Sequence, residues 1–144
     1  MTHEEPQDFN PLVQAQKEFS VKDQAFGGPD GSAVKMEDIT DLVSTQLRII
    51  WLEGRGLVDN RSNFMRGNPL TLLQPWNIDF ANSAVQTFAL SWFRTELERL
   101  KLIRPFAEIH FGYSDKRLSE IDRKMRARQK AIGLLEAHLA DRSG

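Results

Sequence analysis

The sequence predicts a mainly α-helical protein, in which a small three-helix domain follows a long irregular N-terminal arm. Three stretches repeat apolar side chains every three or four residues, as helices packed on one face do, over residues 36–53, 78–103 and 115–141. Residues 1–33 lack such a period and are interrupted by proline and glycine. At most one short extended segment is expected beside the helices.

The N-terminal arm, residues 1–33, is interrupted by Pro6, Pro11 and a glycine-rich stretch at residues 27–32. A single helical turn over residues 12–19 is the one regular element expected in it. Disordered tails usually avoid aromatic residues, yet this arm contains several large apolar side chains. They are Phe9, Leu12, Val13, Phe19 and Phe26. We predict that the arm docks on a partner through these five side chains, with the glycine-rich stretch as a hinge to the helical domain at residues 34–144.

The first predicted helix, residues 36–53, has acidic residues in its opening turns and glycine at its end. Glu37 and Asp38 favour the positive end of a helix dipole, and Gly54 or Gly56 can adopt the positive φ that ends a helix. Its apolar side chains recur at helical spacing. They are Met36, Ile39, Val43, Leu47, Ile50 and Trp51. A connection over residues 55–77 follows.

The second predicted helix, residues 78–103, has one broad apolar face and is expected to form the core. Asn77 is a suitable N-cap, and Pro105 is expected to end the helix near Arg104 because proline restricts the residue before it. The apolar face comprises Ala81, Val85, Phe88, Ala89, Trp92, Leu97 and Leu100. Residues 106–113 then alternate briefly between apolar and polar, which indicates a short strand or an extended linker.

The third predicted helix, residues 115–141, is capped by Ser114 or Asp115 and has the most regular pattern in the chain. Its helix-interface residues are spaced alternately three and four apart, as in a coiled-coil seam. They are Leu118, Ile121, Met125, Ile132, Leu135 and Leu139. Arg128 interrupts the seam, and Gly133 weakens the helix by roughly 1 kcal/mol relative to alanine. The seam can pack within the domain or between chains.

Residue chemistry gives little support for catalysis or for a bound metal. The chain has no cysteine, which excludes thiolate nucleophiles and the common zinc ligand sets. His3, His110 and His138 have no metal-ligand spacing, and no nucleophile signature is present. We therefore predict no catalytic residue, no metal site and no cofactor.

The third helix also has a basic stretch, residues 116–130, which raises the alternative of nucleic-acid binding. Arg123, Lys124 and Arg126 are the candidate phosphate contacts. Interleaved acids and the overall net charge of −1 weaken this hypothesis. The chain ends differ in sign: residues 1–34 hold two Lys and six acids, a net −4, while residues 114–144 hold eight Lys or Arg and five acids, a net +3.

These observations predict a non-enzymatic structural or adaptor subunit of a larger macromolecular assembly, such as a virion or tail, that docks through its arm and its last helix. The expected partners are other protein subunits, copies of itself included, with nucleic acid the less favoured alternative. No membrane partner is expected, because no apolar run is long enough to span a bilayer. The expected location is the cytoplasm or a particle assembled inside the cell.

Overall fold

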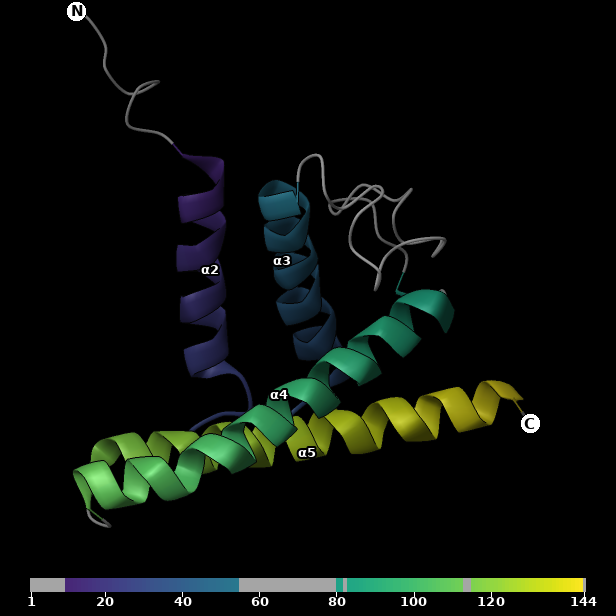
Figure 1. Cartoon of the computed structure of the whole chain (residues 1–144). Coiled ribbons are helices and arrows are strands. Elements are labelled where there is room, and N and C mark those ends of the chain that lie inside the picture. Colours follow the sequence, from purple (N-terminus) through teal and green to yellow (C-terminus); the bar gives the residue numbers. More distant parts are fainter. Residues whose placement is uncertain (1–9, 55–79, 82, 113–114, 144) are drawn as a thin grey trace, which may run out of the picture. The chain divides into compact units, whose positions relative to one another are not determined.

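The computed structural model of the protein describes residues 10–54, 80–81, 83–112 and 115–143. Four helices make up most of this part of the chain: α2 (Pro11–Ala25), α3 (Met36–Gly54), α4 (Ser83–Phe111) and α5 (Lys116–Ser143) (Figure 1). Within the described ranges there is no strand, and the single β-type pairing is an isolated antiparallel bridge between Gly27 and Ala33. The prediction of a mainly α fold is confirmed.

The chain divides into two compact units. One combines the residues up to Gln24 with those from Asp41 to the end of α3. The other combines Ala25–Thr40 with the described residues from Phe80 onward, which include α4 and α5. The loop between α2 and α3 therefore belongs with α4 and α5, and not with the helix that precedes it.

Helix α2 corrects the prediction that the chain is irregular up to residue 33. Asn10 caps the helix, because its Oδ1 accepts hydrogen bonds from the backbone N–H groups of Leu12 (2.9 Å) and Val13 (3.3 Å). Pro11 occupies the first helical position, where no N–H is needed. The turn predicted over residues 12–19 is thus part of a 15-residue helix. Residues 1–9 lie outside the described part of the chain.

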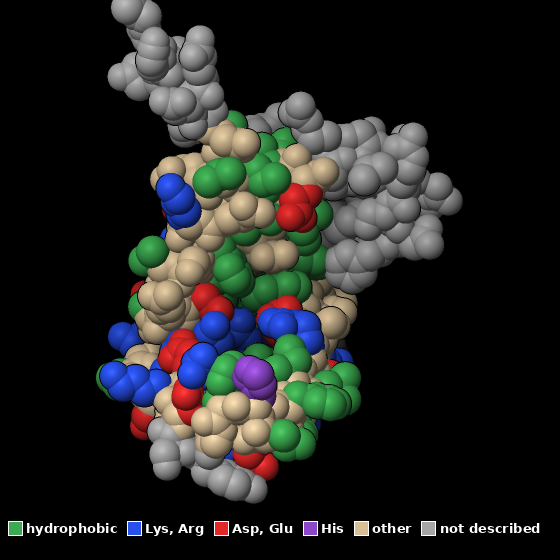
Figure 2. Space-filling model, turned by 60° about the vertical axis from the view of Figure 1, so that its left-hand side comes forward, with side chains coloured by type: hydrophobic (Ala, Val, Ile, Leu, Met, Phe, Trp, Pro, Cys, Tyr) green, Lys and Arg blue, Asp and Glu red, His purple; other side chains and the backbone are tan. Residues whose placement is uncertain are grey.

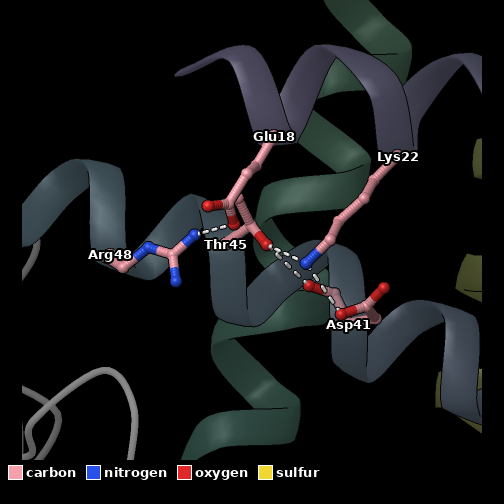
Figure 3. Close-up of polar contacts among 5 residues, drawn as sticks. All are labelled: Glu18, Lys22, Asp41, Thr45 and Arg48. Atoms are coloured by element: carbon pink, nitrogen blue, oxygen red, sulfur yellow. Dashed lines mark hydrogen bonds and ion pairs between the residues drawn. The ribbon is translucent and has the colours of Figure 1, made fainter. Parts of the chain in front are cut away.

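Polar contacts join α2 to the part of α3 in the same unit (Figure 3). The Lys22 ammonium contacts Asp41 Oδ1 at 2.9 Å and Thr45 Oγ1 at 2.8 Å. One turn away, the Arg48 guanidinium pairs with the Glu18 carboxylate. Such partly exposed ion pairs each contribute about 1 kcal/mol or less, so they mainly determine which faces of the two helices meet.

Helix α3 matches the helix predicted over residues 36–53. Asp38 caps its first turn, because its Oδ2 accepts a hydrogen bond from the Lys35 N–H (3.2 Å). The Asp38 N–H in turn donates to the Lys35 backbone carbonyl (3.0 Å). Ile39, Val43 and Leu47 are buried, as their spacing predicts. The connection predicted over residues 55–77 falls outside the described residues.

Helices α4 and α5 run antiparallel and pack together in the second unit (Figure 1). Helix α4 begins at Ser83, because Phe80 and Ala81 form a turn, so the predicted start at residue 78 is wrong. The proposed cap, Asn77, is not among the described residues. The Phe80 carbonyl accepts a 2.7 Å hydrogen bond from the buried Gln86 side chain, which keeps this turn next to the helix.

The predicted end of this helix at Pro105 is also wrong, because α4 continues through the proline to Phe111. Proline inside a helix removes one N–H and crowds the preceding turn, at about 3 kcal/mol. Arg104, the residue before the proline, forms ion pairs on both sides of this position. It pairs with Glu108 one turn later in α4, and its Nε lies 2.6 Å from Oδ1 of Asp122 in α5. The segment predicted as a strand or extended linker is therefore helical over residues 106–111.

A short, well-capped turn joins α4 to α5. Gly112 has a φ of +91°, and its N–H donates to the Glu108 carbonyl at 2.9 Å. Asp115 caps α5, because its carbonyl accepts the Leu118 N–H (3.1 Å) and its carboxylate accepts the Arg117 N–H (2.7 Å). Helix α5 over Lys116–Ser143 thus agrees closely with the predicted helix over residues 115–141.

The glycine-rich stretch at residues 27–32, predicted to be a hinge, lies directly against α5. A Cβ added to Gly31 would overlap the backbone carbonyl of Arg123, and one added to Gly27 would lie 2.8 Å from the Ala127 Cβ. Both glycines have positive φ, +82° and +88°. The preceding Phe26 is buried and stacks on Phe93 of α4, with ring centroids 5.6 Å apart. The loop is therefore packed against both α4 and α5 within the second unit.

We predict that Gly31→Ala lowers the free energy of unfolding by more than about 2 kcal/mol. The left-handed backbone penalises a side chain by roughly 1–2 kcal/mol, and overlap with the Arg123 carbonyl adds to it. Urea denaturation followed by circular dichroism measures this loss.

Two further glycines are the matched controls. Gly112→Ala introduces the same backbone strain with no atom within 4 Å, so it should destabilise less than Gly31→Ala. Gly133→Ala lies inside α5 with open space around it and should stabilise the protein by roughly 0.5–1 kcal/mol. Equal losses at Gly31 and Gly112 would show that the loop does not press on α5.

Candidate interaction surface

The predicted seam of α5 faces partly into its own chain. Leu118 and Leu135 are buried, and so are Ala127 and Ala131 between them. Helix α5 packs against α4, so these positions form the interior of the α4–α5 pair. The remaining helix-interface residues are half-buried: Ile121, Met125, Ile132 and Leu139. The seam is therefore buried within the chain at Leu118 and Leu135 and only partly covered at its other positions.

Arg128, which interrupts this seam, is compensated within the second unit. Arg128 is only 1% exposed. Its Nη2 lies 3.6 Å from Glu96 Oε1, and its guanidinium carbon lies 5.9 Å from the centre of the Trp92 ring. A buried guanidinium needs an opposite charge and hydrogen-bond partners, and an aromatic face adds attraction. The charge at this core position is thus a feature of the α4–α5 packing.

Arg123, the first candidate phosphate contact, is buried and holds the loop that follows α2. Its Nη1 donates to the Phe26 carbonyl at 2.6 Å and reaches the Gly28 carbonyl at 3.5 Å. The other edge of the guanidinium forms two hydrogen bonds to the Glu120 carboxylate, at 3.0 and 2.7 Å. This pairing lowers the pKa of Glu120 below its ordinary value. Arg123 is therefore engaged within the chain on both sides.

Arg126 and Lys124, the other two candidates, flank Arg123 on α5. The Arg126 guanidinium donates to the Asp30 carbonyl, although most of the residue stays exposed. The Asp30 carboxylate in turn accepts hydrogen bonds from the Ser32 hydroxyl (2.6 Å) and N–H (3.0 Å), which lower its pKa. Lys124 is half-buried. Two of the three basic side chains thus fix the conformation of the loop at residues 27–32.

The residues predicted to dock the arm differ in burial. Phe26 is in the core, stacked on Phe93. Leu12 and Phe19 are half-buried on α2, and Val13 is exposed beside them. Phe9 lies outside the described residues. Of the described members, only Phe26 is fully buried, and docking through the others stays a prediction.

The largest group of exposed apolar side chains on one described helix lies at the end of α4. Leu102, Phe106 and Ile109 are 71%, 72% and 83% exposed, and Ile103 beside them is 38% exposed. Their spacing of four and three residues places the first three on one helical face. We refer to these four residues as the α4 strip. Figure 2 shows hydrophobic side chains gathered at the end of the molecule where α4 meets α5.

The charged side chains around the α4 strip are paired within their own chain. Arg99 Nη2 lies 2.9 Å from Glu96, and Lys101 Nζ lies 3.3 Å from Glu98. Across the turn, Arg117 pairs with Asp115 at 2.8 Å and stacks on the ring of Phe111 at 3.7 Å. Figure 2 shows basic and acidic side chains interspersed near the apolar ones. The rim of the strip is therefore close to electroneutral.

The α4 strip was not predicted, although its signal is present in the sequence. Leu102, Phe106 and Ile109 have helical spacing only if the helix passes through Pro105, and the rule that proline ends a helix hid that pattern. Arg104 with Glu108, four residues apart, was the available indication that the helix continues.

In the described part of the chain, no three His, Asp or Glu side chains are grouped so that they could hold a metal ion. None of the described helices combines the length and the apolar character needed to cross a membrane. Comparisons with protein-family models, with curated proteins and with solved structures found no match. The function must therefore be inferred from the surface itself.

We predict that Arg123→Gln lowers the free energy of unfolding by roughly 1.5–3 kcal/mol. The substitution removes a charged donor and leaves the Phe26 carbonyl without it. Lys130→Gln, at an exposed position on the same helix, is the control and should change stability by less than about 0.5 kcal/mol. Similar small effects of both substitutions would contradict the role assigned to Arg123.

We also predict that the protein loses stability as the pH falls from about 4 to about 2. Arg117 lowers the pKa of Asp115 from 3.8 to about 2, and Arg104 lowers the pKa of Asp122. A lowered folded-state pKa gives stability that is present above the ordinary value and is lost as the carboxylate is protonated. Asp115→Asn keeps the cap but not the charge, so its unfolding free energy should fall less over this range. Asp141→Asn, near the end of α5, is the control and should follow the wild type.

Proposed function

We propose that this protein is a non-enzymatic structural or adaptor subunit of a larger macromolecular assembly, and that it docks through the α4 strip. The observation that carries this proposal is the exposure of three large apolar side chains on one face of a rigid helix. Contiguous exposed apolar patches on soluble proteins commonly mark interaction sites. The apolar side chains of α5 are more covered than those of the α4 strip, which supports the strip as the docking surface.

The energetics of burying the α4 strip are adequate for binding. Covering a Leu, Ile or Phe side chain contributes about 1.5–3 kcal/mol, so Leu102, Phe106 and Ile109 together could supply roughly 5–9 kcal/mol before association entropy is subtracted. The three side chains are already held in a helix, which reduces the entropy lost on binding. An assembly that offers several such contacts would not need each one to be strong.

The alternative of nucleic-acid binding has less support. A phosphate contact needs an exposed, available Lys or Arg, whereas Arg123 is buried against the Phe26 carbonyl and Arg126 bonds the Asp30 carbonyl. Using either residue for phosphate would require the loop to leave α5. This arrangement favours a structural role for the basic stretch.

The test is to isolate the native complex with wild-type protein and with the double variant Phe106→Ser, Ile109→Ser. Both side chains are exposed, so the variant should keep its circular dichroism spectrum and stability while its recovery in the complex falls at least tenfold. Val21→Ser is the matched control, because Val21 is a 68% exposed apolar residue on α2. Its incorporation should equal that of the wild type.

Two outcomes would count against the proposal. Undiminished incorporation of the double variant would show that the α4 strip is not the docking surface. Salt-dependent DNA or RNA binding by the folded protein that is lost in Arg126→Ala would instead favour the nucleic-acid alternative.

A further inference from the structure

We infer that the α4 strip is covered by the α4 strip of a second copy of this chain, related by a two-fold axis, so that the protein is a homodimer. This inference rests on the proposed function, because it names the partner that occupies the proposed docking surface. Three observations support a second copy: the spacing of the strip, its area and the charge of its rim.

The spacing of the α4 strip fits a helical partner. Leu102, Phe106 and Ile109 form a ridge along a straight helical face, and such ridges pack into the grooves of another helix. The strip covers about two turns, so it fits one crossing helix better than a broad flat surface. A second α4 offers a helix with the same ridge and grooves.

The area of the strip is also sufficient for a pair of copies. Large apolar side chains bury up to roughly 150–250 Å² each, so four partly exposed ones present on the order of 500 Å². A specific interface should remove at least about 1,000 Å² in total. A two-fold pair covers two strips at once and reaches this size with apolar surface alone.

The rim of the strip neither repels a copy nor attracts a charged partner. Arg99 is paired with Glu96, and Lys101 with Glu98, so like charges are neutralised before two rims approach. For the same reason the rim has little net charge, so its electrostatic potential does not attract a nucleic acid or another anionic surface. An uncharged apolar partner with an equally neutral rim fits best, and a second copy has both properties.

The strip also sets the orientation of the pair. A two-fold interface is isologous, so a residue before the axis meets one after it in the other copy, and only residues at the axis meet their own counterparts. An axis perpendicular to α4 near Phe106 places the two Phe106 side chains together and Leu102 of one copy opposite Ile109 of the other. The two helices then run antiparallel, which also opposes their dipoles favourably.

Sedimentation equilibrium of the full chain tests the inference. The wild type should be dimeric, with a Kd on the order of 10 µM or tighter. Phe106→Ser with Ile109→Ser should weaken dimerisation at least a hundredfold, and Val21→Ser should leave it unchanged. A wild type that stays monomeric well above this concentration, or a double variant that dimerises normally, overturns the inference.

The absence of cysteine in the sequence allows a second, geometric test. Phe106→Cys should form an intermolecular disulfide on mild oxidation, because the axis places the two positions together. Val21→Cys, equally exposed but outside the strip, should form far less under the same conditions. Equal cross-linking at the two positions would contradict the two-fold geometry.

These results separate the inference from the proposed function. If the wild type is monomeric and the strip variants are still lost from the native complex, the docking surface is correct and its occupant is another protein. If the wild type is dimeric through the strip but the strip variants still enter the complex normally, the dimer stands and the proposed docking role falls.

Discussion

Arg123 reaches from α5 to the backbone carbonyls of Phe26 and Gly28, and the loop that carries them comes this close because Gly31 has no side chain. The contact needs both partners: a guanidinium long enough to reach two carbonyls, and a glycine with positive φ packed on the helix backbone. A residue with a Cβ at position 31 would push the loop away from α5. The buried guanidinium of Arg123 would then lose its two carbonyl acceptors.

Several other features depend on this contact. The loop carries Phe26 against Phe93, so an aromatic side chain from the N-terminal part of the sequence completes the core formed by α4 and α5. Two basic residues of α5 that would otherwise suggest phosphate binding contact backbone carbonyls of this loop: Arg123 contacts that of Phe26, and Arg126 contacts that of Asp30. Among the described residues, the apolar side chains at the end of α4 are the most exposed ones gathered on a single helix.

The elements that sequence reasoning predicted well are those whose signals are local. Helices α3 and α5 have regular apolar spacing together with caps, such as Asp38 and Asp115, that act within three residues of themselves. Helix α2 was missed although Asn10 and Pro11 form a recognisable start, because few of its side chains are buried and its apolar period is weak. Its stability comes from contacts with α3, which no short window of sequence shows.

Two long-range contacts explain what the local signals did not show. Pro105 is a local signal for a helix end, yet α4 continues through it, and Arg104 next to it pairs with Asp122, which lies 18 residues away in the sequence. The role of Arg123 depends on a carbonyl 97 residues earlier in the chain. A basic side chain bound in this way has the same sequence appearance as one available for phosphate. The α4 strip could be recognised only once α4 was known to continue past the proline.

Amide hydrogen exchange, measured on the unmodified chain at low and high protein concentration, tests the central claim most directly. If the α4 strip is covered by a second copy, protection should rise with concentration in residues 102–111 while α5 stays unchanged. Protection that rises in the basic stretch of α5, or that does not change in α4, would contradict the account.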